Sequence, residues 1–197
     1  HSIRRRQRQM CIRDRTLHIA VLRSQYASGK IIKLDTSMAS CIPGVHSIID
    51  GKSFAEISKP LLSVLRIDIE VWPCAIEYVR YVGEPIALIL ADDRYIAEDA
   101  VENIKVSYEE YTPIINTLKA TLDDAPKVHN KIKSNVVSDR KFSYGNPKEA
   151  FKKAYKIVEL EVEYPRNSCT PHEGFVVQSH YNACLLYTSD AADDGLS

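Results

Sequence analysis

The sequence has few glycines, and they form no phosphate-binding loop. Its 197 residues include seven glycines, none of which has the GxGxxG or GxxxxGK(S/T) spacing. Such loops need glycine because backbone N–H groups must approach the phosphate oxygens closely. Binding of a dinucleotide or a nucleoside triphosphate through a loop of this kind is therefore not expected.

Paired cysteines are missing too. The five cysteines are isolated along the chain, with no CxxC spacing. Zinc and iron–sulfur sites need clustered thiolates or mixed histidine and cysteine sets. We therefore predict no metal site in this chain. We expect Cys41, Cys74 and Cys169 to be buried thiols of a protein in a reducing compartment, the cytoplasm.

Long apolar runs and an excess of one charge are also absent. The longest apolar run, residues 86–91, is far shorter than the roughly 18–20 residues of a membrane span. The 26 basic side chains equal the 26 acidic ones, which gives no basic face for nucleic acid. The sequence therefore predicts neither a membrane span nor a nucleic-acid partner.

The two ends differ in composition from the rest of the chain. Residues 1–15 are rich in arginine, and residues 184–197 carry three aspartates. Both ends resemble translated sequencing-adapter sequence. We therefore expect residues 1–15 and 184–197 to be non-native, and residues 16–183 to be a stretch of native chain that is truncated at both ends.

Residues 78–113 have the clearest secondary-structure pattern. Residues 86–91 are apolar on both faces, which is typical of a strand covered on both sides. Asp92 is predicted to cap a helix, and residues 104–110 alternate like a strand with one solvated face. The apolar stripe of the helix consists of Ile96, Ala97, Ala100, Val101 and Ile104.

Weaker patterns flank this unit. Asn146 and Pro147 are predicted to begin a helix. Residues 157–164 alternate apolar side chains with glutamates and predict a strand, with residues 175–182 as its candidate hairpin partner. Further strands are predicted at residues 17–24, 31–34 and 45–50. This mixture of elements predicts an α+β fold.

Few residues suggest catalysis. Cys169 and His172 lie three residues apart, and Glu173 follows directly. A cysteine nucleophile needs a base within hydrogen-bond reach, but residues three apart on an extended segment point to opposite faces. A Cys-dependent hydrolase therefore competes with a plain loop thiol and a hydrogen-bonded histidine. His172 and Glu173 are also candidates for residues near a site, against the alternative that backbone donors simply hold the Glu173 carboxylate.

Three stretches resemble a known family. Residues 79–116, which contain VRYVGEPIALILADD, and residues 21–51 closely resemble the α/β-hammerhead domain of molybdenum hydroxylase large subunits. These are the xanthine dehydrogenase, aldehyde oxidase and aerobic carbon monoxide dehydrogenase type enzymes. Residues 135–182 are similar to the start of the next, molybdopterin-binding domain, and fit the carbon monoxide dehydrogenase-like branch best. The chain departs from the family pattern at Gln25, Ser28 and His172.

The resemblance implies a domain order and an activity. It implies a hammerhead domain at residues 16–126, a linker at 127–139 and the truncated start of the molybdopterin-binding domain at 140–183. The implied enzyme oxidises a small carbon substrate with water-derived oxygen at a molybdenum–molybdopterin cofactor. Electrons would pass to [2Fe-2S] and FAD centres on an iron–sulfur small subunit and an FAD-binding medium subunit.

The resemblance places the family's active-site loops downstream of Ala183. Catalytic and cofactor-binding residues are therefore unknown in this chain, and the fragment alone is expected to be inactive. The alternative is a stand-alone hammerhead scaffold or interaction domain without catalytic activity.

Overall fold

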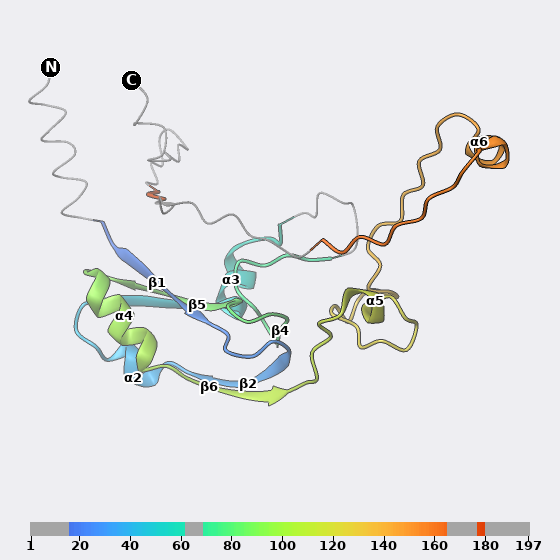
Figure 1. Ribbon diagram of the computed structural model, residues 1–197. Helices are drawn as coiled ribbons and strands as arrows, with labels where there is room; N and C mark the ends of the chain where they lie inside the picture. Colours follow the sequence, from blue (N-terminus) through green and yellow to red (C-terminus); the bar gives the residue numbers. More distant parts are fainter. Residues whose placement is uncertain (1–15, 62–68, 165–176, 180–197) are drawn as a thin grey trace, which may run out of the picture. The chain divides into compact units, whose positions relative to one another are not determined.

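A computed structural model describes residues 16–61, 69–164 and 177–179 (Figure 1). The chain divides into two compact units, residues 1–141 and residues 142–197. The first unit contains both sheets and most of the helices, and the second contains a single described helix.

The first unit is built on two three-stranded antiparallel sheets. Sheet A has the strand order β1-β5-β3, and sheet B has the order β4-β2-β6. The strands of sheet A are β1 (His18–Arg23), β5 (Pro85–Ala91) and β3 (Val45–Asp50). Those of sheet B are β4 (Tyr78–Val79), β2 (Gly29–Asp35) and β6 (Lys105–Glu110). The predicted strands at residues 17–24, 31–34, 45–50, 86–91 and 104–110 are confirmed, and so is the mixed α and β fold.

Helix α4 provides the cover for one face of sheet A. It packs on β1, β5 and β3, with the short helix α2 beside it (Figure 1). Its predicted apolar stripe is confirmed, because Ala97 and Ala100 are buried while Glu98 and Asp99 are exposed. The helices are α2 (Ser37–Ser40), α3 (Gly51–Ile57), α4 (Arg94–Glu102), α5 (Thr117–Ala120) and α6 (Pro147–Lys153).

The core lies around β5, the central strand of sheet A. Ile89 packs with Ala39 and Ala100 in one buried cluster, and Ile86 packs with Val79 in a second. The two clusters share the half-buried Leu22 of β1, so the core runs continuously from α4 to sheet B. The hydrophobic effect therefore fixes β5 as the structural centre of this unit.

The N-cap of α4 is not the predicted residue. The side chain of Asp93 accepts a hydrogen bond from the backbone N–H of Tyr95 at 2.8 Å, so Asp93 is the cap. The prediction of Asp92 was wrong by one position. Asp92 instead contacts His46 at 2.6 Å, which engages its carboxylate with β3 rather than with the helix.

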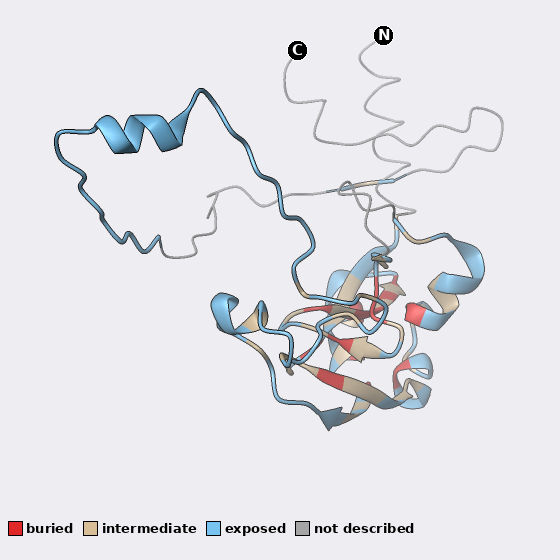
Figure 2. Ribbon diagram, turned by 90° about the vertical axis from the view of Figure 1, so that its right-hand side faces the viewer, coloured by how far each residue is buried: buried red, intermediate tan, exposed pale blue. Residues whose placement is uncertain are grey.

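In the second unit, the helix prediction is confirmed and the strand prediction is wrong. Asn146 caps α6 through the Glu149 backbone N–H, and Pro147 occupies the first turn. Residues 157–164 form no strand, and their apolar residues are exposed. Figure 2 colours the ribbon after α6 as exposed. A strand needs a hydrogen-bonded neighbour, and none of the described residues pairs with this segment. The candidate hairpin partner at 175–182 lies largely outside the described residues.

Within the described part of the chain, no helix combines the length and the apolar character that a membrane crossing requires.

Candidate functional site

The residues predicted to lie near a site cannot be placed. Cys169, His172 and Glu173 all fall outside the described residues. Their roles, whether as a cysteine nucleophile with its base or as residues near a cofactor, therefore stay predictions. The described residues offer three other features with chemical character.

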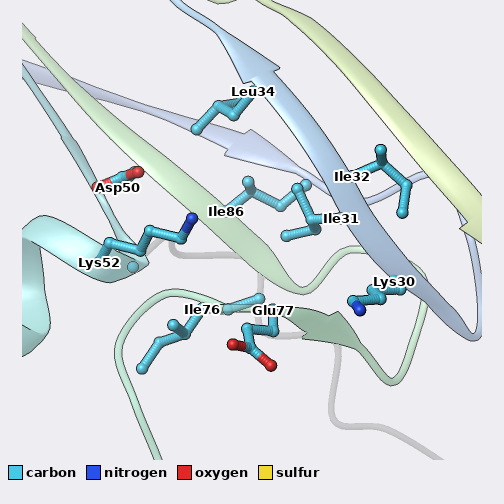
Figure 3. Close-up of a pocket in the computed structure, with 11 residues that line it drawn as sticks. Lys30, Ile31, Ile32, Leu34, Asp50, Lys52, Ile76, Glu77 and Ile86 are labelled. Carbon is cyan, nitrogen blue, oxygen red and sulfur yellow. The ribbon is translucent and has the colours of Figure 1, made fainter.

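The first feature is a groove of about 230 Å³ between β2, the start of α3 and residues 75–77 (Figure 3). Its walls are aliphatic, formed by Ile31, Ile32, Leu34, Ile76 and Ile86. Its charged lining residues are Lys30, Asp50, Lys52 and Glu77. No sequence pattern predicted this grouping, because the lining residues come from four segments that lie apart in the chain.

The charges of the groove have structural partners or face solvent. Asp50 caps α3, accepting hydrogen bonds from the backbone N–H and the hydroxyl of Ser53 at 2.8 and 2.6 Å. Lys52 and Glu77 are exposed. Gly51 lies so close to residue 75 that a Cβ atom would sit 2.2 Å from the Ala75 carbonyl oxygen. The groove is therefore a tight junction between structural elements.

The second feature is the turn between β4 and β5. The buried carboxylate of Glu84 accepts the backbone N–H of Arg80 and, at 3.2 Å, the Arg80 guanidinium. Gly83 has a φ of 90°, a backbone conformation that favours glycine. Ser24 closes the turn, because its N–H donates to the Glu84 carbonyl and its carbonyl accepts from Gly83, both at 2.8 Å. These bonds make the turn rigid rather than reactive.

The third feature is a pair of thiols. Cys74 is fully buried, and burial raises its pKa to about 11, with a smaller contribution from the nearby negative charge of Asp50. A protonated thiol is a poor nucleophile, so Cys74 is a structural residue. Cys41 is exposed, which corrects the prediction that it is buried, because it follows the last turn of α2 on the surface of the unit.

The described residues do not fit a molybdenum–molybdopterin cofactor. No three His, Cys, Asp or Glu side chains in the described ranges come together as a metal-binding group. The groove is also smaller than the roughly 300–1,000 Å³ that pockets for ligands of this size occupy. No chemical step is therefore assigned to residues in the described part of the chain.

Comparison with known proteins gives a consistent set of relatives. Residues 9–112 match the family described as aldehyde oxidase and xanthine dehydrogenase, a/b hammerhead domain. The carbon monoxide dehydrogenase large chain of Hydrogenophaga pseudoflava is 34% identical over 110 residues, which cover 56% of this chain and 14% of that protein.

Two solved structures share the fold. Quinoline 2-oxidoreductase from Pseudomonas putida 86 superposes with a TM-score of 0.57 and 31% identity, covering 68% of this chain and 19% of that one. The carbon monoxide dehydrogenase from Oligotropha carboxidovorans superposes with a TM-score of 0.52 and 31% identity, covering 56% and 14%. The chain thus spans less than a fifth of each of these proteins.

Proposed function

Because the chain belongs to the aldehyde oxidase and xanthine dehydrogenase α/β-hammerhead domain family, we propose that it is part of the large, molybdenum-cofactor-binding subunit of a molybdenum hydroxylase. The observation that carries this proposal is the family match over residues 9–112, which includes all the described strands and the helices α2, α3 and α4. The hammerhead is a supporting domain in this proposal, and the cofactor is bound by other parts of the subunit.

The proposed reaction is the oxidation of a small carbon substrate with oxygen taken from water. The molybdenum–molybdopterin cofactor supplies this chemistry when bound. Two electrons and two protons leave for each oxygen atom transferred, and the electrons pass to [2Fe-2S] and FAD centres on an iron–sulfur small subunit and an FAD-binding medium subunit. The complex is proposed to be cytoplasmic.

The contribution of the described residues is structural. Asp50 and Asp93 cap helices, Glu84 holds a turn, and Cys74 is buried and protonated. In this proposal these groups order the two sheets. We further propose that the hammerhead covers residues 16–126, that a linker follows at 127–139, and that the molybdopterin-binding domain begins at 140–183.

Two substrate classes have support among the relatives. The similarity to carbon monoxide dehydrogenase large chains favours carbon monoxide, which would leave as carbon dioxide. The similarity to quinoline 2-oxidoreductase favours an aromatic N-heterocycle, which would gain a hydroxyl group. We propose the carbon monoxide dehydrogenase-like branch on the 34% identity to the Hydrogenophaga pseudoflava large chain, since the two solved structures are equally similar in sequence, at 31% identity each.

A single reconstitution tests the proposal. The complete gene would be expressed together with its neighbouring genes in a host that makes the molybdenum cofactor, and the purified complex would be analysed for molybdenum, FAD and iron. We expect all three, together with dye reduction by carbon monoxide. Quinoline-dependent dye reduction without carbon monoxide oxidation would overturn the branch assignment.

The 197-residue chain expressed alone is the control. We expect it to retain no molybdenum and to reduce no dye. A complete protein that binds no molybdenum under conditions where a known molybdenum hydroxylase does would reject the enzyme and favour the stand-alone scaffold.

A further inference from the structure

Sheet A has one face that the unit covers. In antiparallel pairs, residues directly opposite each other project to the same face. Ile89 of β5 lies opposite Ala20 of β1 and Ile48 of β3, which places all three side chains on one face. Ile89 is fully buried in the cluster that contains Ala100 of α4. This face is therefore the one that α4 covers.

The other face of sheet A carries aliphatic side chains as well. Leu88 lies opposite Val21 and Ile49, and Leu90 lies opposite Ile19. We call this set the open face of sheet A: Ile19, Val21, Ile49, Leu88 and Leu90. Ser47, opposite Leu90, is its polar neighbour, and none of the residues in these pairs is charged.

No described helix covers the open face of sheet A, whereas α4 covers the other face. Ile19 is 59% exposed and the other four side chains are half-buried, whereas Ala87, Ile89 and Ala91 on the α4 side are fully buried. None of the five packs against either buried cluster of the described residues. An antiparallel sheet that faces water on one side normally alternates apolar and polar residues. β5 does not alternate, so its sequence is suited to a sheet covered on both sides.

The size of the open face limits what can cover it. Three strands about 4.8 Å apart, with about five residues each at 3.4 Å per residue, give a patch of roughly 240 Å². A stable complex between separate proteins needs roughly 800 Å² from each partner. A segment of the same polypeptide needs far less, because its attachment removes most of the entropic cost of association. The area therefore favours an occupant in the same chain.

We propose that the open face of sheet A is the surface on which the rest of the same large subunit docks, through a layer of aliphatic side chains. This inference rests on the proposed function, which makes the hammerhead one domain of a longer protein. The relatives leave ample chain for such a layer, since this chain spans 14% of one carbon monoxide dehydrogenase large chain and 19% of quinoline 2-oxidoreductase. A face without charge suits a permanent contact rather than an exchanging partner.

Cysteine accessibility tests the proposal without requiring catalysis. Ile19→Cys and Leu90→Cys would be made separately in the complete large subunit and in the 197-residue chain, and their maleimide labelling rates measured by peptide mass spectrometry. The matched control is Glu98→Cys on the solvated side of α4. Circular dichroism would confirm that each variant keeps the fold of its parent.

We expect both open-face cysteines to react at least about tenfold more slowly in the complete subunit than in the 197-residue chain, because access controls thiol reactivity. The control should change by less than about twofold, since its side chain stays solvated. Equally fast labelling of Ile19→Cys in both proteins would overturn the proposal.

Other occupants give other patterns, and each overturns the proposal. Protection in the 197-residue chain that grows with protein concentration would indicate a second copy. Protection that appears only when separate subunits are added would indicate a different partner. An active molybdenum enzyme with a freely labelled open face would reject this inference and leave the proposed function intact. A protected open face in a subunit that binds no molybdenum would support this inference and reject the proposed function.

Discussion

The buried carboxylate of Glu84 stabilises the turn that precedes β5 through its hydrogen bonds to Arg80. Its side chain is 12% exposed and accepts from both the backbone and the guanidinium of Arg80, whose own side chain is 30% exposed. Glu84→Gln would leave the guanidinium without its counter-charge. We expect the free energy of unfolding to fall by about 2 kcal/mol, as for other partly buried charged hydrogen bonds. Urea unfolding followed through the single tryptophan measures it.

Glu98→Gln is the matched control for Glu84→Gln. It removes the Arg94–Glu98 ion pair at 2.7 Å, whose side chains are 73% and 50% exposed. Solvent screens such a pair, so the loss should stay below about 0.5 kcal/mol. Equal effects of the two substitutions would show that burial of Glu84 contributes nothing to stability.

The raised pKa of Cys74 predicts that its thiol reacts only at high pH. Burial raises its pKa to about 11, so at pH 8 only about one molecule in a thousand carries the thiolate, against about one in four for a free cysteine. We expect iodoacetamide to modify exposed Cys41 at pH 8 and to leave Cys74 intact until urea unfolds the chain. Peptide mass spectrometry separates the two sites.

The same shift gives a stability effect with a defined sign. The unfolded thiol loses its proton near pH 8.5, whereas the folded thiol keeps its proton until about pH 11. The folded state therefore loses stability as the pH rises through this window. Cys74→Ala should remove that part of the alkaline loss, and an unchanged slope between pH 8.5 and 11 in the variant would contradict the assignment.

Single residues were only partly predictable from the sequence. The start of α6 at Asn146 was predicted, because asparagine followed by proline is a common helix start, and the Asn146 side chain accepts from the Glu149 N–H. The burial of Glu84 was not, since it depends on Arg80 folding back over four residues. The grouping of the groove residues could not be predicted, because Lys30, Asp50 and Glu77 come together only through tertiary packing.

At the scale of elements, the two aspartates at the start of α4 have different roles, because Asp93 caps the helix and Asp92 contacts His46. Asp93→Ala removes the side chain that caps the helix through the Tyr95 N–H, and an N-cap of this kind contributes about 1 kcal/mol. Asp92→Ala removes an exposed contact to His46, which contributes less than about 0.5 kcal/mol. Urea unfolding of both variants measures the difference. A larger loss for Asp92→Ala would restore the original assignment of the cap.

The elements that were predicted correctly are those whose pattern is satisfied within one unit. Residues 86–91 and the stripe of α4 bury their apolar side chains against each other, so the local pattern and the tertiary structure agree. Residues 157–164 have an equally regular alternation but no partner strand among the described residues. Alternation predicts which side chains share a face, and it cannot supply the neighbour that a strand requires.

At the scale of the whole molecule, the polar groups of the first unit serve its architecture. The carboxylates of Asp50, Glu84 and Asp93 each accept a backbone N–H. Lys131 pairs with Glu70 at 2.8 Å and ties the segment after β6 back to the unit. These structural roles agree with the proposed role of the hammerhead as a supporting domain of a longer enzyme.

The division of the chain predicts a protease-resistant body. Residues after Lys141 are exposed up to residue 164, including the lysines Lys148 and Lys156. Within the described residues, we expect trypsin to cut first at Lys141, Lys148 and Lys156, which lie outside the last turn of α6, because proteases need unpacked backbone. The resistant product should end near Lys141, as measured by mass spectrometry of a time course. Earlier cleavage within β5, α4 or β6 would contradict the division.

The loop before Lys141 provides the control for this experiment. Lys131 is exposed, yet its loop is held by Asn135, whose side chain donates to the carbonyls of Ala120 and Pro126 at 3.0 and 2.9 Å and accepts from the Val128 N–H at 2.9 Å. We therefore expect cleavage at Lys131 to be slow in the parent chain. Asn135→Ala removes all three bonds and should bring that cleavage to the rate seen at Lys148. If the rate at Lys131 is the same in both proteins, the loop is protected by something other than these hydrogen bonds.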